Sequence, residues 1–269
     1  MNRLGIELLS VLGMPPVEHV RIAADLGCAH ISTGLTRVPD PFNPYGYAEW
    51  SLREDAALRR EMVAALRDTG VTISLGEGFG VRPGQAIADK ARDFDLMAEL
   101  GARGIGGVVM EPDLARAYDE FAQLVEMATS RGMIATIEFA PPHPVGSLGD
   151  ALALVRHIDN PDFRVLIDAM HFFRSGGTVE QLRALDPALI GYAQLCDVPL
   201  TSERDYMEEA MTGRLAPGTG ELPLADFIAA LPGDIPLGLE MPRFAEAQAG
   251  IAPIDVLRPG VEAARTLGA

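Results

Sequence analysis

Four side chains with oxygen atoms that can bind a metal lie at the ends of short apolar runs in the second half of the chain: Glu138, Asp168, Gln194 and Glu240. If these runs are parallel strands, their carboxyl ends meet at one edge of a sheet or at one end of a barrel. Three carboxylates gathered in an apolar setting would repel one another and lose hydration, unless a cation neutralised them or some of them took up a proton. A bound divalent ion would meet both demands.

The donor types indicate a hard metal. Carboxylate and amide oxygens suit Mg²⁺ or Mn²⁺ better than a thiolate-seeking ion, and Co²⁺ or Zn²⁺ can also occupy such a site. A single acidic residue at a strand end is more often a helix cap or a partner in a surface ion pair. Four oxygen donors in the order Glu, Asp, Gln, Glu on consecutive predicted strands favour one divalent metal ion, with Glu138, Asp168, Gln194 and Glu240 as its ligands.

Four other residues are candidates for substrate binding. His171 follows the second predicted ligand by three residues, which would bring its imidazole over the mouth of the site, unless it only caps a helix. Arg214 lies in a segment rich in Gly and Pro, where a guanidinium can bind a carboxylate, phosphate or enolate oxygen, unless it is an exposed, solvated arginine. His143 follows the first predicted ligand within the same loop, and Glu77 lies in the loop after the third predicted strand.

Strand-length apolar runs alternate with longer segments in which apolar residues recur at helical spacing, a pattern typical of βαβ units and a parallel sheet. The eight predicted strands are Leu4 to Leu9, Cys28 to Ser32, Val71 to Leu75, Ile105 to Val109, Ile134 to Glu138, Phe163 to Asp168, Leu189 to Leu195 and Ile235 to Glu240. The predicted helices are Pro16 to Leu26, Asp55 to Thr69, Ala86 to Leu100, Leu114 to Arg131, Leu148 to Ile158, Val179 to Leu185, Leu224 to Ala230 and Ile254 to Leu267.

The residues at the predicted helix ends agree with this alternation of strands and helices. Gly27, Gly70, Gly101 and Gly132 each stand just past a predicted helix and just before a strand, where a left-handed residue commonly ends a helix. Eight βα units with right-handed crossovers favour a (β/α)8 TIM barrel over a long open sheet. No glycine-rich fingerprint follows the first strand, which disfavours a dinucleotide-binding sheet. We therefore expect residues 1–269 to form one TIM barrel domain.

Active sites of such barrels lie at the C-terminal ends of the strands, where the βα loops gather. Three of these loops, 33–52, 76–85 and 197–223, are longer than the scaffold requires, and loops of that length commonly cover or bind a ligand. Glu77 and Arg82 both lie in the second of them.

Composition excludes several classes of function. A formal net charge of -16 disfavours nucleic acid and anionic membranes as partners, because phosphate binding depends on Lys and Arg. The two cysteines, Cys28 and Cys196, lie in apolar stretches and are too few for a disulfide framework, so we expect a cytoplasmic protein. We expect neither a signal peptide nor a membrane-spanning segment. The sequence leaves a homo-oligomer open.

Several short motifs, in a fixed order, carry a family resemblance. They are Ile137-Glu138, then Ile167-Asp168-Ala169-Met170-His171, then Gln194 with Asp197 three residues on, then the run from Gly213 to Glu221, and finally Glu240. The second is similar to an Asp-x-x-His step and the fourth to an Arg-x-x-Pro-Gly-x-Gly loop. Together they resemble the xylose isomerase-like barrel superfamily of sugar phosphate isomerases and epimerases, over nearly the whole chain.

Members with this pattern typically bind one divalent metal through four side chains, and in the ketose epimerases two glutamates also exchange a substrate proton. The resemblance therefore implies that Glu138 and Glu240 act as catalytic acid and base, with Asp168 and Gln194 as the other ligands. The chain departs from the ketose epimerases at the third ligand, which is usually His. Gln194 is closer to the 3-dehydroshikimate dehydratases of the same superfamily.

We therefore expect a metal-dependent isomerase or epimerase that acts on a sugar or related polyhydroxy carbonyl compound through an enediolate. The same first step followed by loss of a β-hydroxyl would make the protein a dehydratase of a cyclic hydroxy-ketone such as 3-dehydroshikimate, and this alternative stays open. A non-catalytic sugar-binding barrel would need neither both glutamates nor a metal. An endonuclease of the apurinic-site type shares the barrel, but only five histidines and the acidic charge oppose it.

Overall fold

A computed structural model describes residues 2–269 and shows eight parallel strands closed into one barrel, in the order β1 to β8. The predicted fold class is confirmed. The strands are β1 (Leu4–Ile6), β2 (His30–Thr33), β3 (Thr72–Val81), β4 (Gly104–Val109), β5 (Ile134–Glu138), β6 (Phe163–Asp168), β7 (Ile190–Leu195) and β8 (Leu237–Leu239).

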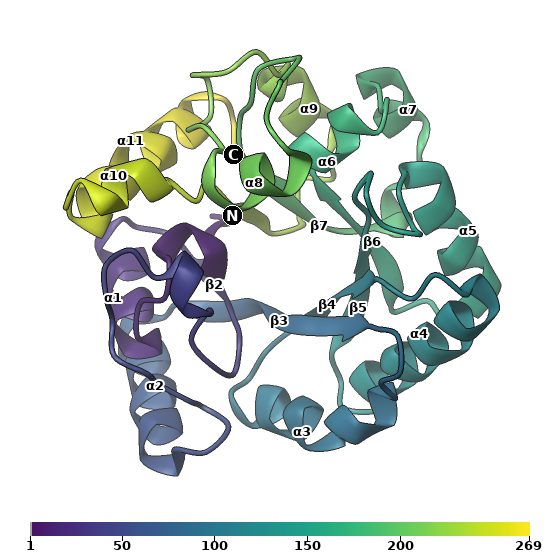
Figure 1. The fold of residues 1–269 in the computed structure, drawn as a ribbon, viewed down its shortest axis with the longest axis horizontal. Coiled ribbons are helices and arrows are strands. Elements are labelled where there is room, and N and C mark those ends of the chain that lie inside the picture. Colours follow the sequence, from purple (N-terminus) through teal and green to yellow (C-terminus); the bar gives the residue numbers. More distant parts are fainter. Residues whose placement is uncertain (1) are drawn as a thin grey trace.

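Helices surround the barrel as an outer ring, and α8 lies inside that ring beside the barrel opening (Figure 1). The α-helices are α1 (Pro16–Asp25), α2 (Ala56–Thr69), α3 (Ala91–Glu99), α4 (Leu114–Thr129), α5 (Leu148–Ile158), α6 (Ala169–Arg174), α7 (Val179–Ala184), α8 (Tyr206–Thr212), α9 (Leu224–Ala230), α10 (Phe244–Gln248) and α11 (Pro253–Thr266). Short 3₁₀ helices are η1 (Leu8–Val11), η2 (Asp40–Phe42), η3 (Ile87–Lys90) and η4 (Pro187–Leu189). None of the helices in residues 2–269 is both long and apolar enough to cross a membrane.

Local signals account for the helix ends. Asp55 caps α2 by accepting hydrogen bonds from the backbone N–H groups of Ala57 and Leu58. At the other end of α2, Gly70 has a φ of 76°, a left-handed conformation that costs glycine little. The predicted glycines at the ends of the other helices also have positive φ: Gly27, Gly101 and Gly132.

Two predicted boundaries were wrong in ways that matter for the site, and three short helices were missed. β1 ends at Ile6 rather than Leu9, because Leu8–Val11 turns into the 3₁₀ helix η1. The region 76–85, predicted to be a long loop, is mostly a continuation of β3 to Val81. The short helices α6, α8 and α10 were not predicted.

A β-bulge interrupts β3 near the barrel opening. In the pairing of β3 with β4, the register passes from Gly76 opposite Ile105 to Phe79 opposite Gly107, so β3 contains one extra residue at this point. Gly78, inside this bulge, has a φ of 89°. Since a bulge redirects the side chains beside it, this irregularity accounts for the turn of Glu77 toward the cavity described below.

Candidate active site

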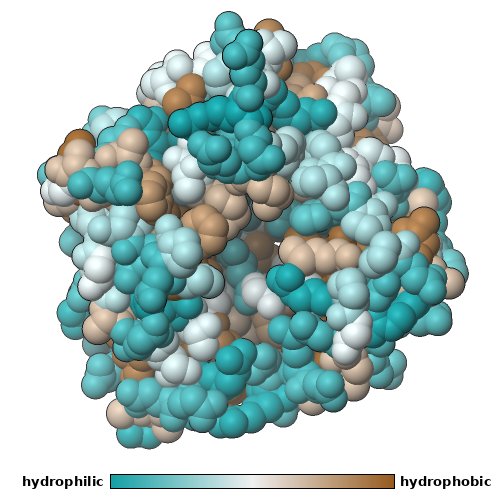
Figure 2. Space-filling view, viewed as in Figure 1, coloured by the Kyte–Doolittle hydropathy of each residue, from teal (hydrophilic) through white to brown (hydrophobic). Residues whose placement is uncertain are grey.

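A cavity of about 450 Å³ opens at the C-terminal end of the barrel, where Figure 2 shows a hollow near the centre of the molecular face. Six of the predicted site residues line it: Glu77, Glu138, His143, His171, Arg214 and Glu240. The other two predicted residues, Asp168 and Gln194, lie against them and are 1% and 2% exposed. The structure therefore brings all eight candidates to one end of the barrel.

Arg214 lies at the centre of the predicted ligand set. Its Nη1 is 2.6 Å from Oδ2 of Asp168 and 2.7 Å from Oε2 of Glu240, so one guanidinium nitrogen joins the ends of β6 and β8. Its Nε donates to the carbonyl oxygen of Ala210 on α8, at 2.8 Å. Only 3% of this residue is exposed, so the alternative of an exposed, solvated arginine was wrong.

Asp168 has two structural roles at once. One oxygen binds Arg214, while Oδ1 accepts the backbone N–H of His171 at 2.9 Å and thereby caps α6. Burial raises the pKa of Asp168, but the positive charge of Arg214, the adjacent His171 and the hydrogen bonds from both residues together outweigh that effect and hold the pKa below its usual value. Asp168 is therefore an ionised carboxylate at neutral pH.

His171 lies within the short helix α6 rather than in a loop, and it is buried. Its Nε2 is 3.5 Å from Oε1 of Glu138 and 3.4 Å from Nη2 of Arg214, and its Nδ1 is 2.6 Å from the hydroxyl of Tyr206. Burial lowers the pKa of His171 to about 4, so the ring is neutral at pH 7. Because the guanidinium can only donate, Nε2 is assigned as the acceptor and Nδ1 as the protonated nitrogen.

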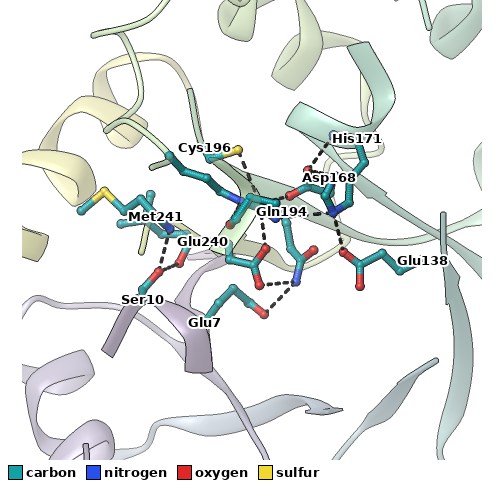
Figure 3. A network of polar contacts seen from close by, with 12 residues as sticks. Glu7, Ser10, Glu138, Asp168, His171, Gln194, Cys196, Glu240 and Met241 are labelled. Carbon is teal, nitrogen blue, oxygen red and sulfur yellow. Dashed lines mark hydrogen bonds and ion pairs between the residues drawn. The ribbon is translucent and has the colours of Figure 1, made fainter. Parts of the chain in front are cut away.

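Gln194 is held by two carboxylates (Figure 3). Its Nε2 donates to Oε2 of Glu7 at 3.2 Å and to Oε1 of Glu240 at 3.3 Å. Its Oε1 is buried and has no hydrogen-bond partner among the described residues. A buried carbonyl oxygen without a partner is costly, unless something else binds it.

Glu7 is a further buried carboxyl at the site, and the sequence analysis missed it. The residue follows β1 and is fully buried. Its Oε1 accepts the hydroxyl of Tyr192 at 2.6 Å, and that hydroxyl also lies 2.9 Å from Oγ of Ser74. Within the described residues, carboxylate oxygens of Glu7, Glu77 and Glu240 lie within 4.8 Å of one another. A Glu inside the apolar run Leu4 to Leu9 was the signal that could have identified it.

Crowding of carboxyl groups perturbs their acidity. Burial, then the nearby charge of Glu240, raises the pKa of Glu7 to about 7. Burial and Glu7 raise the pKa of Glu77 to about 8, and Ser32 donates a hydrogen bond to its carboxylate. Burial raises the pKa of Glu240 to about 8, even though Arg214 partly offsets the rise. Burial, Glu240 and Asp168 raise the pKa of Glu138 well above its usual value.

These residues fit a divalent cation. Five carboxyl groups lie at the site, those of Glu7, Glu77, Glu138, Asp168 and Glu240, and Arg214 is the only arginine among the described residues that forms an ion pair with any of them, so the site has excess negative charge whenever most of them are ionised. The donors are hard oxygens, and the unpartnered Gln194 Oε1 is a neutral oxygen ligand beside them. Asp168 and Glu240 each engage Arg214 through one oxygen and keep the other free of it.

The closed barrel of eight parallel strands, surrounded by helices, is the architecture of a (β/α)8 TIM barrel. The model of the xylose isomerase-like TIM barrel family matches residues 20–265, and the chain belongs to this family. No curated protein sequence matches the chain at a significant level.

Solved structures share the fold at low sequence identity. A xylose isomerase-like TIM barrel/4-hydroxyphenylpyruvate dioxygenase fusion protein has a TM-score of 0.79 and 24% identity, and the alignment covers 98% of this chain but only 42% of the fusion protein. The probable 3-DHS dehydratase AsbF, involved in petrobactin synthesis in Bacillus anthracis, has a TM-score of 0.75, 15% identity and 97% coverage of both chains. D-psicose 3-epimerase, solved with D-fructose, has a TM-score of 0.68 and 16% identity, with 98% of this chain and 99% of that chain covered.

Proposed function

We propose that the protein is a divalent-metal-dependent isomerase or epimerase of a small hydroxy-carbonyl compound, and that it moves a proton on the carbon beside the carbonyl. The observation that carries this proposal is the position of Glu138 and Glu240 on one cavity, with Asp168 and Gln194 adjacent to them. One carboxyl group can take the proton and the other can return it. Similarity to D-psicose 3-epimerase supports the same class of reaction.

Each of these side chains has a role in the proposed reaction. Glu138, on β5, keeps 22% of its side chain exposed within the cavity, which leaves a carboxyl oxygen within reach of a substrate. Glu240 is anchored by Arg214, so its carboxyl group stays in one position. His171, neutral and oriented by Tyr206, can exchange a hydrogen bond with a substrate hydroxyl. A divalent ion held by Glu138, Asp168, Gln194 and Glu240 would stabilise the negative charge that develops on the substrate oxygens.

The stereochemical outcome depends on which glutamate returns the proton and where. Return to the opposite face of the same carbon inverts that centre and gives an epimer. Return to the adjoining carbon interconverts an aldose and a ketose. Both outcomes use the same pair of carboxyl groups, Glu138 and Glu240.

Exchange of solvent deuterium tests the proposal. The protein, loaded with Mn²⁺, is incubated in D₂O with a panel of ketoses and other hydroxy-carbonyl compounds, and deuterium incorporation is followed by NMR. We expect incorporation beside the carbonyl of at least one compound, lost on chelation and in Glu138→Gln. Absence of exchange across the panel in a metal-loaded, folded protein would count against an isomerase or epimerase.

A second candidate is dehydration of a cyclic hydroxy-ketone that bears a carboxylate, such as 3-dehydroshikimate. The observation that favours it is Arg82, which lines the cavity beside His143. Of the other arginines that line the cavity, Arg53 binds Asp93 through two hydrogen bonds and Arg37 binds Asp40 and Glu49.

Arg214, the fourth arginine of the cavity, is likewise paired with carboxylates, whereas Arg82 has no carboxylate within 4.0 Å among residues 2–269. Among the described residues, the only hydrogen bond of its guanidinium runs from Nη1 to the sulfur of Met110, at 2.8 Å. The adjacent walls are largely apolar and include Leu8, Leu35, Val38, Phe79, Val108, Met207 and Met211. Such walls suit a ring with few hydroxyls better than an open-chain sugar, and Arg82 would then bind its carboxylate.

Direct incubation with 3-dehydroshikimate decides between the two candidates. Growth of a catechol-type absorbance, lost in Glu138→Gln and slowed by a raised KM in Arg82→Gln, would favour the dehydratase. An unchanged absorbance in this assay, together with deuterium exchange into a ketose, would favour the isomerase or epimerase.

A further inference from the structure

The amide of Gln194 is held in one orientation by hydrogen bonds on a single side. Its nitrogen donates to Glu7 and to Glu240, which leaves the oxygen on the opposite side of the planar group, turned away from Glu7 (Figure 3). Glu240 belongs to the predicted ligand set, so its carboxylate would be engaged by a metal. Glu7 is the acceptor outside that set, and it would remain available to the amide nitrogen.

The residues around Glu7 hold its carboxyl group in one position. The hydroxyl of Tyr192 fixes Oε1 of Glu7 at 2.6 Å and leaves Oε2 for Gln194. A Cβ added to Gly238 would lie 1.6 Å from Oε1 of Glu7, so the glycine on β8 provides the space that this carboxyl group occupies. Burying a carboxyl group costs stability relative to an apolar side chain of similar size. Folding alone gives no reason for Glu7 at this position.

We propose that Glu7 is a positioning residue that fixes the Gln194 amide so that its oxygen, and not its nitrogen, faces a divalent ion held with Glu138, Asp168 and Glu240. This inference rests on the metal site of the proposed function. An amide nitrogen carries two hydrogens and cannot ligate a cation, so a Gln194 side chain that rotates by half a turn loses the fourth ligand. Partners that orient metal ligands are typically worth about 10–100-fold in metal affinity.

Mn²⁺ affinity, measured by EPR titration of chelator-treated protein, tests the proposal in a double-mutant cycle. Glu7→Met removes the acceptor at similar volume, whereas Glu7→Gln keeps an acceptor oxygen and removes only the charge. Tyr192 can accommodate the amide of the Glu7→Gln variant by accepting its N–H, because the Tyr192 hydroxyl can then donate to Oγ of Ser74 on its other side. We expect Glu7→Met to weaken Mn²⁺ binding by about 10–100-fold and Glu7→Gln by less than about 5-fold.

The second arm uses Gln194→Glu, in which both ends of the side chain are oxygens and no orientation has to be fixed. In this background, we expect the loss caused by Glu7→Met to shrink by at least about 5-fold. Equal losses in Glu7→Met and Glu7→Gln would overturn the proposal, because charge alone would then explain them. Equal losses from Glu7→Met in the wild-type and the Gln194→Glu backgrounds would overturn it too.

Separate control experiments distinguish a loss of folding from a loss of metal binding. Thermal unfolding followed by circular dichroism shows whether each variant is folded. If Glu7→Met fails to fold, Tyr192→Phe takes its place, since it keeps Glu7 but removes the hydrogen bond that fixes it. That variant should weaken Mn²⁺ binding by about 3–10-fold in the wild-type background and not in the Gln194→Glu background, and any other pattern contradicts the proposal. A wild-type protein that binds no Mn²⁺ refutes the proposed function as well, whereas tight binding that Glu7 does not influence refutes only this inference.

Discussion

At the scale of single residues, the site is a cluster of carboxyl groups whose protons compete with a metal. Glu7, Glu77 and Glu240 have pKa values raised to about 7, about 8 and about 8, against an ordinary value of 4.5. The physical cause in each case is chiefly burial, which penalises the charged form. Asp168 is the exception, since Arg214 and a backbone N–H stabilise its charge.

The raised pKa values predict how the metal-free protein responds to pH. A carboxyl group whose pKa is higher in the folded than in the unfolded state binds more protons when the protein is folded. Its contribution to stability is therefore complete below its unfolded pKa and is lost as pH rises through its folded pKa. Stability should therefore fall between about pH 5 and pH 8. We expect the Tm to drop by roughly 5–10 °C over this range, since 1 kcal/mol corresponds to about 2–4 °C in a domain of this size.

Thermal melts of chelator-treated protein at several pH values measure this slope. Glu77→Gln removes one of the titrating groups and should flatten the slope, while Asp68→Asn on the surface serves as a control that should not. A Tm that rises with pH in the same interval would show that these carboxyl groups are ionised in the folded, metal-free protein.

Glu240 carries a separate prediction as a proton carrier. Glu240→Gln keeps the shape of the side chain but cannot exchange a proton, so turnover of a verified substrate should fall by about 10²–10⁴-fold. Circular dichroism should remain that of the wild type. Normal turnover in this variant would exclude Glu240 from acid-base chemistry.

At the scale of elements, α8 connects the cavity wall to the ionic centre. It contributes Met207 and Met211 to the wall, and the chain that follows it carries Arg214. An ion pair joins this helix to α6: Nη2 of Arg174 lies 3.1 Å from Oε2 of Glu209, with side-chain exposures of 16% and 5%. We therefore expect the pair to hold α8 against the barrel.

Loss of that ion pair should release α8. Glu209→Gln leaves Arg174 without its counter-charge in a largely buried setting, which destabilises the local structure more than a surface pair would. We expect limited proteolysis within 199–213 to become several-fold faster. Arg183→Gln is the matched control, because its ion pair with Asp226 is largely exposed and its loss should leave the cleavage rate unchanged. Equal rates for wild type and Glu209→Gln would show that the ion pair does not hold α8.

The elements also show what the sequence could and could not predict. Strands β5 and β6 are mainly apolar and end in Glu138 and Asp168, and Gln194 is the penultimate residue of the mainly apolar β7, so these three positions were predictable from pattern alone. The bulges in β3 and β7 shift the register by one residue without a change in hydrophobic pattern, so they were not. Helices as short as α6 and α8 contain too few residues for a helical period to stand out.

Two residues of the site illustrate the same limit. Glu7 was overlooked because it lies within an apolar run that was predicted to be one strand, whereas the chain turns into η1 directly after it. Arg214 was identified as a candidate, but its burial between Asp168 and Glu240 depends on a loop that folds back over the barrel, and local sequence does not encode that contact.

At the scale of the whole molecule, the barrel is the rigid support that brings distant residues together. Glu7 and Glu240 are far apart in the chain, yet β1 and β8 are paired neighbours, and the backbone N–H of Glu7 donates to the carbonyl oxygen of Leu239 at 3.0 Å. Closure of the barrel thus places the first and last strand ends side by side. The proposed metal site depends on this closure, because its ligands come from four different strand ends.

The proposed metal site is tested most directly by the number of Mn²⁺ ions that chelator-treated protein binds per chain. EPR titration at about pH 7.5 measures this number, because a metal there competes well with the protons of the carboxyl groups whose pKa values are raised. We expect one tightly bound ion per chain in the wild type. Glu138→Gln and Asp168→Asn should each reduce the occupancy at a fixed, near-stoichiometric Mn²⁺ concentration, with the fold retained by circular dichroism. A wild-type protein that binds no ion, or unchanged binding in both variants, would contradict the assigned metal site.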